Sequence, residues 1–261
     1  MLGLVAACCC SRLSILMPVI PFRYMVSGLS QLHGPSLPII RDGSSYNRPS
    51  PWLLVGLGNP GPKYEGTRHN VGFEMIDYIA QAENISIHLI HCKALCGKGH
   101  IGNVPVLLAK PQTYMDLSGE SVGPLAAYHR IRLHHVLLMF DDMSLPCGVL
   151  RLCPRGGHGC HNGRVRSVIK GFKQNENFAR LRIGIGKPPR KVDPKAYVLE
   201  VFNISAREMV NSALKEGVEA VKLFTSEGFF ESVNRFNIMQ KYKHQKIDYL
   251  DIGKIHDSGG G

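Results

Sequence analysis

A histidine and a carboxylate stand at positions typical of proton-transfer chemistry. His69 lies in the polar segment "GTRHNVG", and Asp141 and Asp142 directly follow the apolar run "VLLMF" at residues 136–140. A carboxylate bonded to a histidine orients the ring and raises its basicity, which makes the imidazole a general base near neutral pH. His69 and one of these two carboxylates predict a hydrolytic or proton-transfer site.

Other polar groups follow or lie next to further apolar runs. They are Asn59 and Tyr64 in the loop after residues 52–57, Tyr114, Met115 and Asp116 in "PQTYMDLSG" (111–119), and His161 and Asn162 in "GGHGCHNG" (156–163). Ligands of open α/β sheets bind at the carboxyl ends of the strands, so we expect these loops to converge on one site. On the first stretch alone a structural alternative stays open, in which Asn59 caps a turn and His69 begins a helix.

The first loop also has the spacing of a nucleotide-binding turn. Its segment "GLGNPG" (56–61) matches G-x-G-x-x-G, which in dinucleotide-binding folds opens directly into a helix facing a pyrophosphate. Pro60 and Pro62 remove N–H donors and delay any helix. The nearest acidic residue suited to a ribose, Asp77, falls within a helical pattern. The stretch therefore favours a polar loop over a nucleotide site.

A zinc site is the alternative for the histidines and cysteines near residue 95. His91, Cys92, Cys96 and His100 include two thiols and two imidazoles, which suit tetrahedral zinc. The segment lacks a C-x-x-C pair and alternates like a strand, so we expect buried thiols and surface histidines, with no metal. The unevenly spaced cysteines beyond residue 50 do not suggest a disulfide framework.

Apolar periodicity predicts strands that alternate with helices. The expected strands are 52–57, 86–101, 104–109, 136–140, 148–152 and 180–186. One helix is expected to follow the first loop and end near Asn84, and further helices are expected at 117–128, 164–173 and 205–226. This order predicts an α/β fold with a twisted, mixed and largely parallel sheet covered by helices on both faces. We find no internal repeat and expect a single domain.

The chain ends differ in composition from this body. Residues 1–41 contain no Asp or Glu, and a Pro/Ser linker "NRPSP" follows at 47–51. We expect 1–50 to be a transit peptide and linker, 51–245 the folded domain and 246–261 a frayed tail. The apolar patch at 2–10 is too short to span a bilayer, so no membrane association is expected. The short, arginine-bearing leader favours mitochondria over the chloroplast stroma.

The chain is strongly basic, with a net charge of +11 and a pI near 9.4. Residues 1–50 hold four of the 31 Lys and Arg and one of the 20 Asp and Glu, which leaves 27 against 19, or +8, for the remainder. The leader therefore does not explain the excess. A polyanionic partner such as nucleic acid is expected.

Five segments together resemble the bacterial-type peptidyl-tRNA hydrolase family: "GLGNPGPKYEGTRHNVG", "KPQTYMDLSG", "DDMSLPCG", "GGHGCHNG" and "FARLRIGIGKP". They cover about residues 52–245 and look most similar to the plant organellar branch. That branch includes mitochondrial and chloroplast hydrolases and a chloroplast group II intron splicing factor. The resemblance implies hydrolysis of the ester between peptide and tRNA, without a metal or other cofactor. It also leads us to expect a monomer.

The resemblance also implies roles for individual residues. His69 matches the general base and Asp141 the carboxylate that orients it, while Asn59 and Asn162 match amides that contact substrate. The remaining substrate or tRNA contacts implied are Tyr64, Tyr114, Met115, Asp116, His161, Arg151 and Arg182.

Several positions depart from the family pattern. Asp116 replaces the asparagine of "MNLSG" and, when ionised, cannot donate a hydrogen bond. Phe140, Ser144 and Cys153 stand where a histidine, an acid and a basic residue are usual, although Arg151 flanks Cys153. Two alternatives follow: a hydrolase weakened by Asp116, or a non-enzymatic splicing cofactor of the same fold that acts through a partner protein.

Overall fold

The computed structural model describes residues 50–153, 155, 163–226 and 229–257. Contacts divide the chain into the units Met1–Ser45 and Tyr46–Gly261, and every described residue belongs to the second unit. The predicted transit peptide and most of its linker, within residues 1–50, therefore lie almost entirely outside the described residues, and their role remains a prediction.

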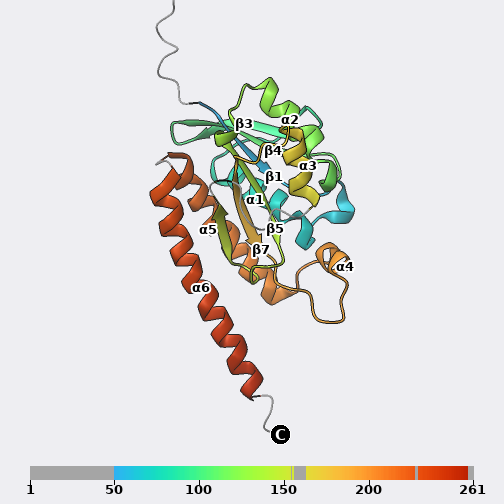
Figure 1. Cartoon of the computed structure of the whole chain (residues 1–261), viewed down its shortest axis with the longest axis vertical. Coiled ribbons are helices and arrows are strands. Elements are labelled where there is room, and N and C mark those ends of the chain that lie inside the picture. The colour runs from blue at the N-terminus through green and yellow to red at the C-terminus, as the bar shows by residue number, and fades with distance from the viewer. Residues whose placement is uncertain (1–49, 154, 156–162, 227–228, 258–261) are drawn as a thin grey trace, which may run out of the picture. The chain divides into compact units, whose positions relative to one another are not determined.

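A seven-stranded sheet forms the centre of the described part (Figure 1). The strands are β1 Trp52–Gly56, β2 Leu89–His91, β3 Ala94–Ile101, β4 Val104–Pro111, β5 Val136–Asp142, β6 Leu150–Cys153 and β7 Ala179–Gly184, in the order β2-β3-β4-β1-β5-β7-β6. The central strands β4, β1, β5 and β7 are parallel, and the outer strands pair antiparallel. The prediction of a mixed, largely parallel sheet is thus confirmed.

Helices cover both faces of this sheet. They are α1 Val71–Ala82, α2 Gly119–Tyr128, α3 Gly163–Gly171, α4 Pro194–Leu199, α5 Ile204–Ser226 and α6 Phe229–Asp257, with 3-10 turns η2 Pro62–Tyr64, η3 Arg68–Asn70, η4 Met115–Leu117 and η5 Leu133–His135. Alternate strand residues point to opposite faces. One face packs with α1 and α5 in one apolar cluster, and the other packs with α2 and α3.

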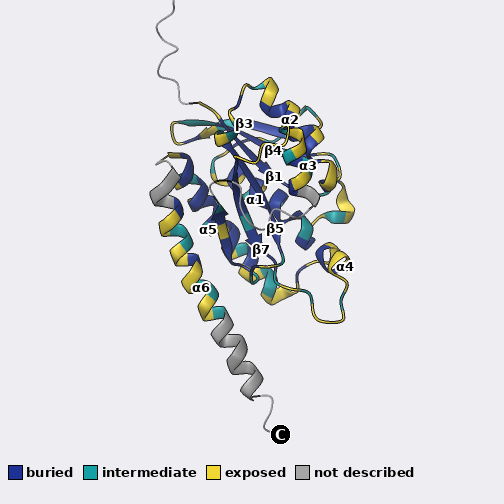
Figure 2. Ribbon diagram, in the orientation of Figure 1, coloured by how far each residue is buried: buried dark blue, intermediate teal, exposed yellow. Residues whose placement is uncertain are grey.

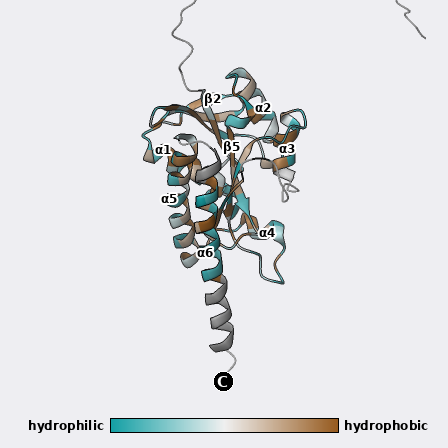
Figure 3. Ribbon diagram, turned by 60° about the vertical axis from the view of Figure 1, so that its left-hand side comes forward, coloured by the Kyte–Doolittle hydropathy of each residue, from teal (hydrophilic) through white to brown (hydrophobic). Residues whose placement is uncertain are grey.

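The burial and hydropathy of the elements follow this layering. The central strands are buried between the helices (Figure 2), and the coloured parts of the outer helices α5 and α6 mix polar and apolar residues (Figure 3). All seven positions of β5 and all five positions of β1 are buried, as expected for parallel strands with both faces covered. None of the described helices is long and apolar enough to cross a membrane.

One sequence expectation about elements was wrong. Residues 86–101 do not form one strand, because β2 and β3 form a hairpin that turns at Cys92 and Lys93, whose φ angles are 47° and 58°. Neither residue is a glycine or asparagine, so the usual turn signal was absent. Helix α6 continues to Asp257 and so includes residues 246–257 of the expected frayed tail, whose fraying stays a prediction. The polar sequence of this segment contains no proline, so no residue there strongly opposes a helix.

The glycines of the first loop serve close packing. A Cβ on Gly56 would lie 2.1 Å from the carbonyl oxygen of Gly72, and one on Gly72 would lie 2.4 Å from that of Leu57. These contacts let the start of α1 approach the end of β1. Because α1 begins only at Val71, a turn and two 3-10 segments separate it from β1. This geometry differs from a dinucleotide-binding turn, where the helix starts within the glycines.

Candidate active site

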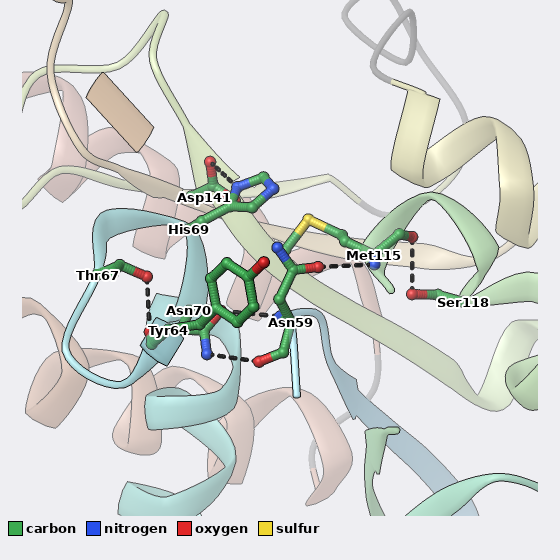
Figure 4. A network of polar contacts seen from close by, with 8 residues as sticks. All are labelled: Asn59, Tyr64, Thr67, His69, Asn70, Met115, Ser118 and Asp141. Carbon is green, nitrogen blue, oxygen red and sulfur yellow. Dashed lines mark hydrogen bonds and ion pairs between the residues drawn. The ribbon is translucent and has the colours of Figure 1, made fainter. Parts of the chain in front are cut away.

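His69 and Asp141 meet at the carboxyl end of the sheet (Figure 4). The Nδ1 atom of His69 lies 3.3 Å from each carboxylate oxygen of Asp141. The Asp141 side chain is fully buried, whereas that of His69 is 16% exposed. With Nδ1–H donated to the carboxylate, Nε2 is the ring atom that can accept a proton. The pair thus has the arrangement of an oriented general base.

Different elements deliver the two residues. Asp141 lies near the end of the buried strand β5, and His69 lies in η3, the turn directly before α1. Since neighbouring strand residues point to opposite faces, Asp141 faces the α1 side and Asp142 the α3 side. Only the first of the two adjacent carboxylates can therefore serve His69.

A hydrogen-bonded frame holds Asn59 beside this pair (Figure 4). The backbone N–H of Asn59 donates to Oδ1 of Asn70 at 2.8 Å, and Nδ2 of Asn70 donates back to the Asn59 carbonyl at 2.9 Å. The side-chain Oδ1 of Asn59 accepts the backbone N–H of Met115 at 2.9 Å. Because Oδ1 is the acceptor in that bond, the donor group Nδ2 of Asn59 is the end available to a substrate.

Tyr64, Met115 and Tyr114 belong to the loops around Asn59. The half-buried ring of Tyr64 projects toward His69 and Asn59 (Figure 4), and Thr67 Oγ1 donates to the Tyr64 carbonyl at 2.7 Å. Met115 is buried, and its carbonyl accepts a bond from Ser118 Oγ at 2.9 Å. Tyr114 is exposed one residue before it. These side chains can form the walls of an entrance to the site.

Asp116 is exposed in η4, directly after Met115. It makes no hydrogen bond or ion pair with the residues that the structure describes. Its carboxylate therefore remains able to meet an incoming ligand.

Arg182 and Arg151 lie on neighbouring strands, at paired positions of β7 and β6. Arg182 forms an ion pair with Asp142 through Nε and donates to Ser144 Oγ at 2.9 Å. Burial lowers the pKa of the Arg182 guanidinium, but the hydrogen bond and charge of Asp142 outweigh it and leave the pKa raised. Arg151 is exposed. Both arginines lie on the α3 side of the sheet, opposite His69 and Asp141.

Two of the predicted site residues, His161 and Asn162, lie outside the described residues, and their roles stay predictions. Two other residues received no role from the sequence but hold the site together. Asn70 clamps the backbone of Asn59. Arg68 ties the turn carrying His69 to residues 200–201. Both flank His69 in "TRHN", which was the available signal.

Metal coordination finds no support within the described ranges. There, no group of three or more His, Cys, Asp or Glu side chains could hold a metal ion. Burial, followed by the charge of Cys92, raises the pKa of the Cys96 thiol to about 11. Cys96 is buried in the apolar cluster that packs with α2, as expected for a buried structural thiol.

Comparisons with known proteins agree with this geometry. A family model described as peptidyl-tRNA hydrolase matches residues 53–246. A chloroplastic group IIB intron splicing facilitator of Arabidopsis thaliana, CRS2-A, is 49% identical and aligns over 92% of this chain and 99% of its own. A mitochondrial peptidyl-tRNA hydrolase of Oryza sativa is 57% identical over 73% of this chain and 76% of its own.

A solved structure is similar to the fold as well. The crystal structure of peptidyl-tRNA hydrolase from Acinetobacter baumannii matches with a TM-score of 0.66 at 34% identity. The match covers 71% of this chain and 94% of the bacterial one. With the family model covering well over half of the sequence, this chain belongs to the peptidyl-tRNA hydrolase family.

Proposed function

We propose that this protein hydrolyses the ester that joins a peptide to the 3′ end of tRNA and so recycles tRNA from stalled organellar translation. The observation that carries the proposal is the His69–Asp141 pair at the carboxyl end of the sheet, next to the oriented amide of Asn59. The family match over residues 53–246 supplies the class of ester.

The geometry supports a direct attack by water. His69 Nε2 removes a proton from a water molecule as its oxygen attacks the ester carbonyl, and Asp141 stabilises the imidazolium that forms. When the carbonyl–oxygen bond breaks, His69 returns the proton to the departing ribose oxygen. The products are a peptide with a free carboxyl group and a tRNA with a free terminal hydroxyl. No further reactant is required.

Asn59 and Asn162 would stabilise the charge that develops on the ester oxygen. The Nδ2 group of Asn59 is directed by the bond between Met115 N–H and Asn59 Oδ1. Such a fixed donor contributes more than a mobile one, because it needs no reorganisation during the reaction. We propose that Asn162 supplies a second amide and that His161 assists it.

The tRNA itself would be bound by charge and by the entrance residues. Arg151 and Arg182 on adjacent strands are proposed to meet tRNA phosphates, with Asp142 and Ser144 holding the Arg182 guanidinium in place. We propose that Tyr64, Tyr114 and Met115 contact the peptide or the terminal nucleoside.

The test is release of tRNA from an N-blocked aminoacyl-tRNA by the full chain. We expect His69→Ala to lower kcat by about 100-fold or more, since general-base catalysis contributes about 10²- to 10⁴-fold. The matched control is His100→Ala, which removes an exposed histidine on strand β3. Equal release by the native chain and His69→Ala would remove the hydrolase proposal.

We propose mitochondria as the organelle. The acid-free residues 1–41 favour an organellar address, and relatives carry both mitochondrial and chloroplastic names. A fluorescent fusion of residues 1–50 should enter mitochondria in plant cells, with a fusion of residues 51–100 as control. Import into chloroplasts would overturn this assignment.

A second candidate function has its own support. The alignment with the splicing facilitator CRS2-A spans 99% of that protein. This likeness favours a role in intron splicing, in the chloroplast, through a partner protein. Loss of the protein would then reduce spliced transcripts, and a His69→Ala transgene would restore them, because no ester hydrolysis is involved.

A further inference from the structure

A cluster of three rings lies on the surface outside the site around His69. His91 of strand β2 and Tyr128 of helix α2 pack with ring centroids 4.3 Å apart, and His129 lies 5.4 Å from His91 and 5.0 Å from Tyr128. Tyr128 is 68% exposed, and the two histidines are half-buried. We call these three residues the ring cluster. The ring pairs are edge-to-face, and the large exposed fraction of Tyr128 leaves much of its side chain accessible.

The ring cluster lies in a basic environment. Burial is the main cause that lowers the pKa of His129, followed by the positive charges of Lys98 and His91. Lys98 and Arg130 are both exposed. Lys98 lies two residues after Cys96 on strand β3, so the two side chains point to the same face of the sheet. Cys96 packs in the cluster that includes α2, which places Lys98 on the α2 side.

Few acidic residues in this part of the sequence oppose that charge. Residues 84–140, which form β2, β3, β4 and α2, contain only Asp116 and Glu120 as acids, against five Lys or Arg. Glu120 is already paired with Lys93, whose Nζ lies 2.9 Å from its carboxylate, and Lys110 is paired with Asp77 from α1 at 2.6 Å. Among the described residues, no ion pair is formed by Lys98 or Arg130. An exposed tyrosine with uncompensated basic neighbours has the chemistry of a surface that binds single-stranded RNA.

We propose that the ring cluster, with Lys98 and Arg130, is an RNA-contacting surface separate from the ester site. An unpaired base stacks on the face of Tyr128, and the neighbouring phosphates pair with Lys98 and Arg130. Helix α2 begins at Gly119, four residues after Met115, and its ten residues extend about 15 Å to Tyr128. An RNA whose 3′ end is bound at His69 is long enough to cover that distance.

The proposal rests on the proposed function only for the identity of the RNA. Either the body of the tRNA or another RNA strand presents bases and phosphates of this kind. A protein partner is the competing occupant, because Ile90 on the same hairpin is 80% exposed. The charge around the ring cluster favours RNA over an apolar protein surface.

Fluorescence anisotropy of labelled tRNA and of a short unstructured RNA tests the surface directly, with the full chain. We expect Tyr128→Ala to weaken binding of at least one RNA by about 10-fold, in the range measured for base stacking on aromatic residues. Tyr128→Phe keeps the ring and should bind as the native chain does. The matched control is Tyr242→Ala, which removes a tyrosine of equal exposure, 68%, from α6.

A charge variant adds a second readout. Lys98→Glu should weaken RNA binding and reduce the slope of log affinity against log salt by about one. A loss only with tRNA identifies the tRNA body as the ligand, and a loss with both RNAs identifies a general single-strand surface. Unchanged RNA affinity in both Tyr128→Ala and Lys98→Glu overturns the proposal. So does a change in self-association, seen by sedimentation, without any change in RNA binding.

A minimal substrate separates this proposal from the hydrolase proposal. An N-blocked aminoacyl-adenosine occupies only the ester site, so Tyr128→Ala and Lys98→Glu should hydrolyse it with native kcat/KM. The native chain could hydrolyse neither the aminoacyl-adenosine nor the aminoacyl-tRNA while Tyr128→Ala still loses RNA affinity. In that case the RNA surface stands and the hydrolase proposal fails. If the native chain hydrolyses its substrates and the variants keep the native RNA affinity, the hydrolase proposal stands and the RNA surface fails.

Discussion

Among the departures from the family pattern, we expect Asp116 to have the largest effect on ester hydrolysis. It follows Met115, whose backbone N–H orients the Asn59 side chain, so any substrate held by Asn59 lies close to it. Asparagine at this position in the family pattern can donate to a carbonyl or phosphate oxygen, whereas an ionised aspartate only accepts. The exposed carboxylate also repels the phosphates of RNA.

We therefore expect Asp116→Asn to increase kcat/KM on peptidyl-tRNA by about 10-fold or more, since a single missing donor costs about 10²-fold when it serves the oxyanion. Steady-state kinetics of the native and substituted chains measure this. Glu120→Gln removes another exposed carboxylate, together with its ion pair to Lys93, and is the control for loss of negative charge in this region. Unchanged or slower hydrolysis by Asp116→Asn would show that Asp116 is not the weak point.

At the scale of elements, the turn that carries His69 is attached to the segment between α4 and α5. The backbone N–H of Arg68 donates to the Glu200 carbonyl at 3.0 Å, and Nη1 of Arg68 donates to the Val201 carbonyl at 2.8 Å. The guanidinium carbon of Arg68 lies 4.2 Å from the ring centroid of Tyr197. Arg68 thus fixes η3 to the segment between α4 and α5 and acts as a positioning residue.

Arg68→Lys should lower kcat several-fold and change KM little. Lysine keeps the charge but cannot both stack as a plane on Tyr197 and bond the Val201 carbonyl. Tyr197→Phe keeps the ring beneath Arg68 and loses only its bond to the Ile185 carbonyl, so it is the matched comparison with a smaller effect on kcat. If Arg68→Lys instead raised KM several-fold and left kcat unchanged, this would contradict positioning of His69 by Arg68.

Helix α6 protects the edge of the sheet. Strand β6 is the last strand, and its backbone N–H groups at Leu150 and Leu152 donate to side-chain oxygens of Gln240 and Asn237 at 2.9 and 3.0 Å. Asn237 Nδ2 also donates back to the Leu152 carbonyl at 2.8 Å. Amide side chains of a helix here replace a neighbouring strand, which prevents pairing with another chain at this edge.

For the whole molecule, two histidines link stability to pH. His135 stacks on Trp52 with centroids 4.9 Å apart, and burial is the main cause that lowers its pKa, followed by the charges of His134 and Arg132. Burial likewise lowers the pKa of His129. The unfolded chain, with ordinary histidine pKa values near 6.5, then binds more protons than the folded chain at mildly acidic pH.

Stability should therefore be fully present above about pH 6.5 and fall as the pH drops below it toward the lowered folded pKa values. Urea unfolding at pH 7.5 and 5.5 measures the change in the free energy of unfolding. His135→Gln removes one of these groups and should show a smaller decrease between the two pH values, while exposed His100→Gln should follow the native chain. Equal decreases in all three would contradict the assignment to His135.

Much of the fold was predictable because apolar periodicity is local. The parallel strands around β1 and β5 are runs of buried residues, and the amphipathic α5 agrees closely with the predicted 205–226. The β2–β3 hairpin was not predictable, because Cys92 and Lys93 adopt left-handed angles without a glycine or asparagine to signal a turn. Helix α6 was missed because its polar sequence has no clear apolar stripe.

The sequence by itself determined the chemical groups: a histidine, a carboxylate and amides in loops after apolar strands, the likeness to one hydrolase family, and the unusual Asp116. The family likeness implied Asp141, but only the tertiary structure gave the reason, which is that Asp141 and not Asp142 faces His69, and only it showed that Asn70 and Arg68 hold the site in place. It also separated Arg182 from the base, since it faces the other side of the sheet. Such choices depend on strand register and on contacts between residues far apart in the chain, which local patterns do not encode.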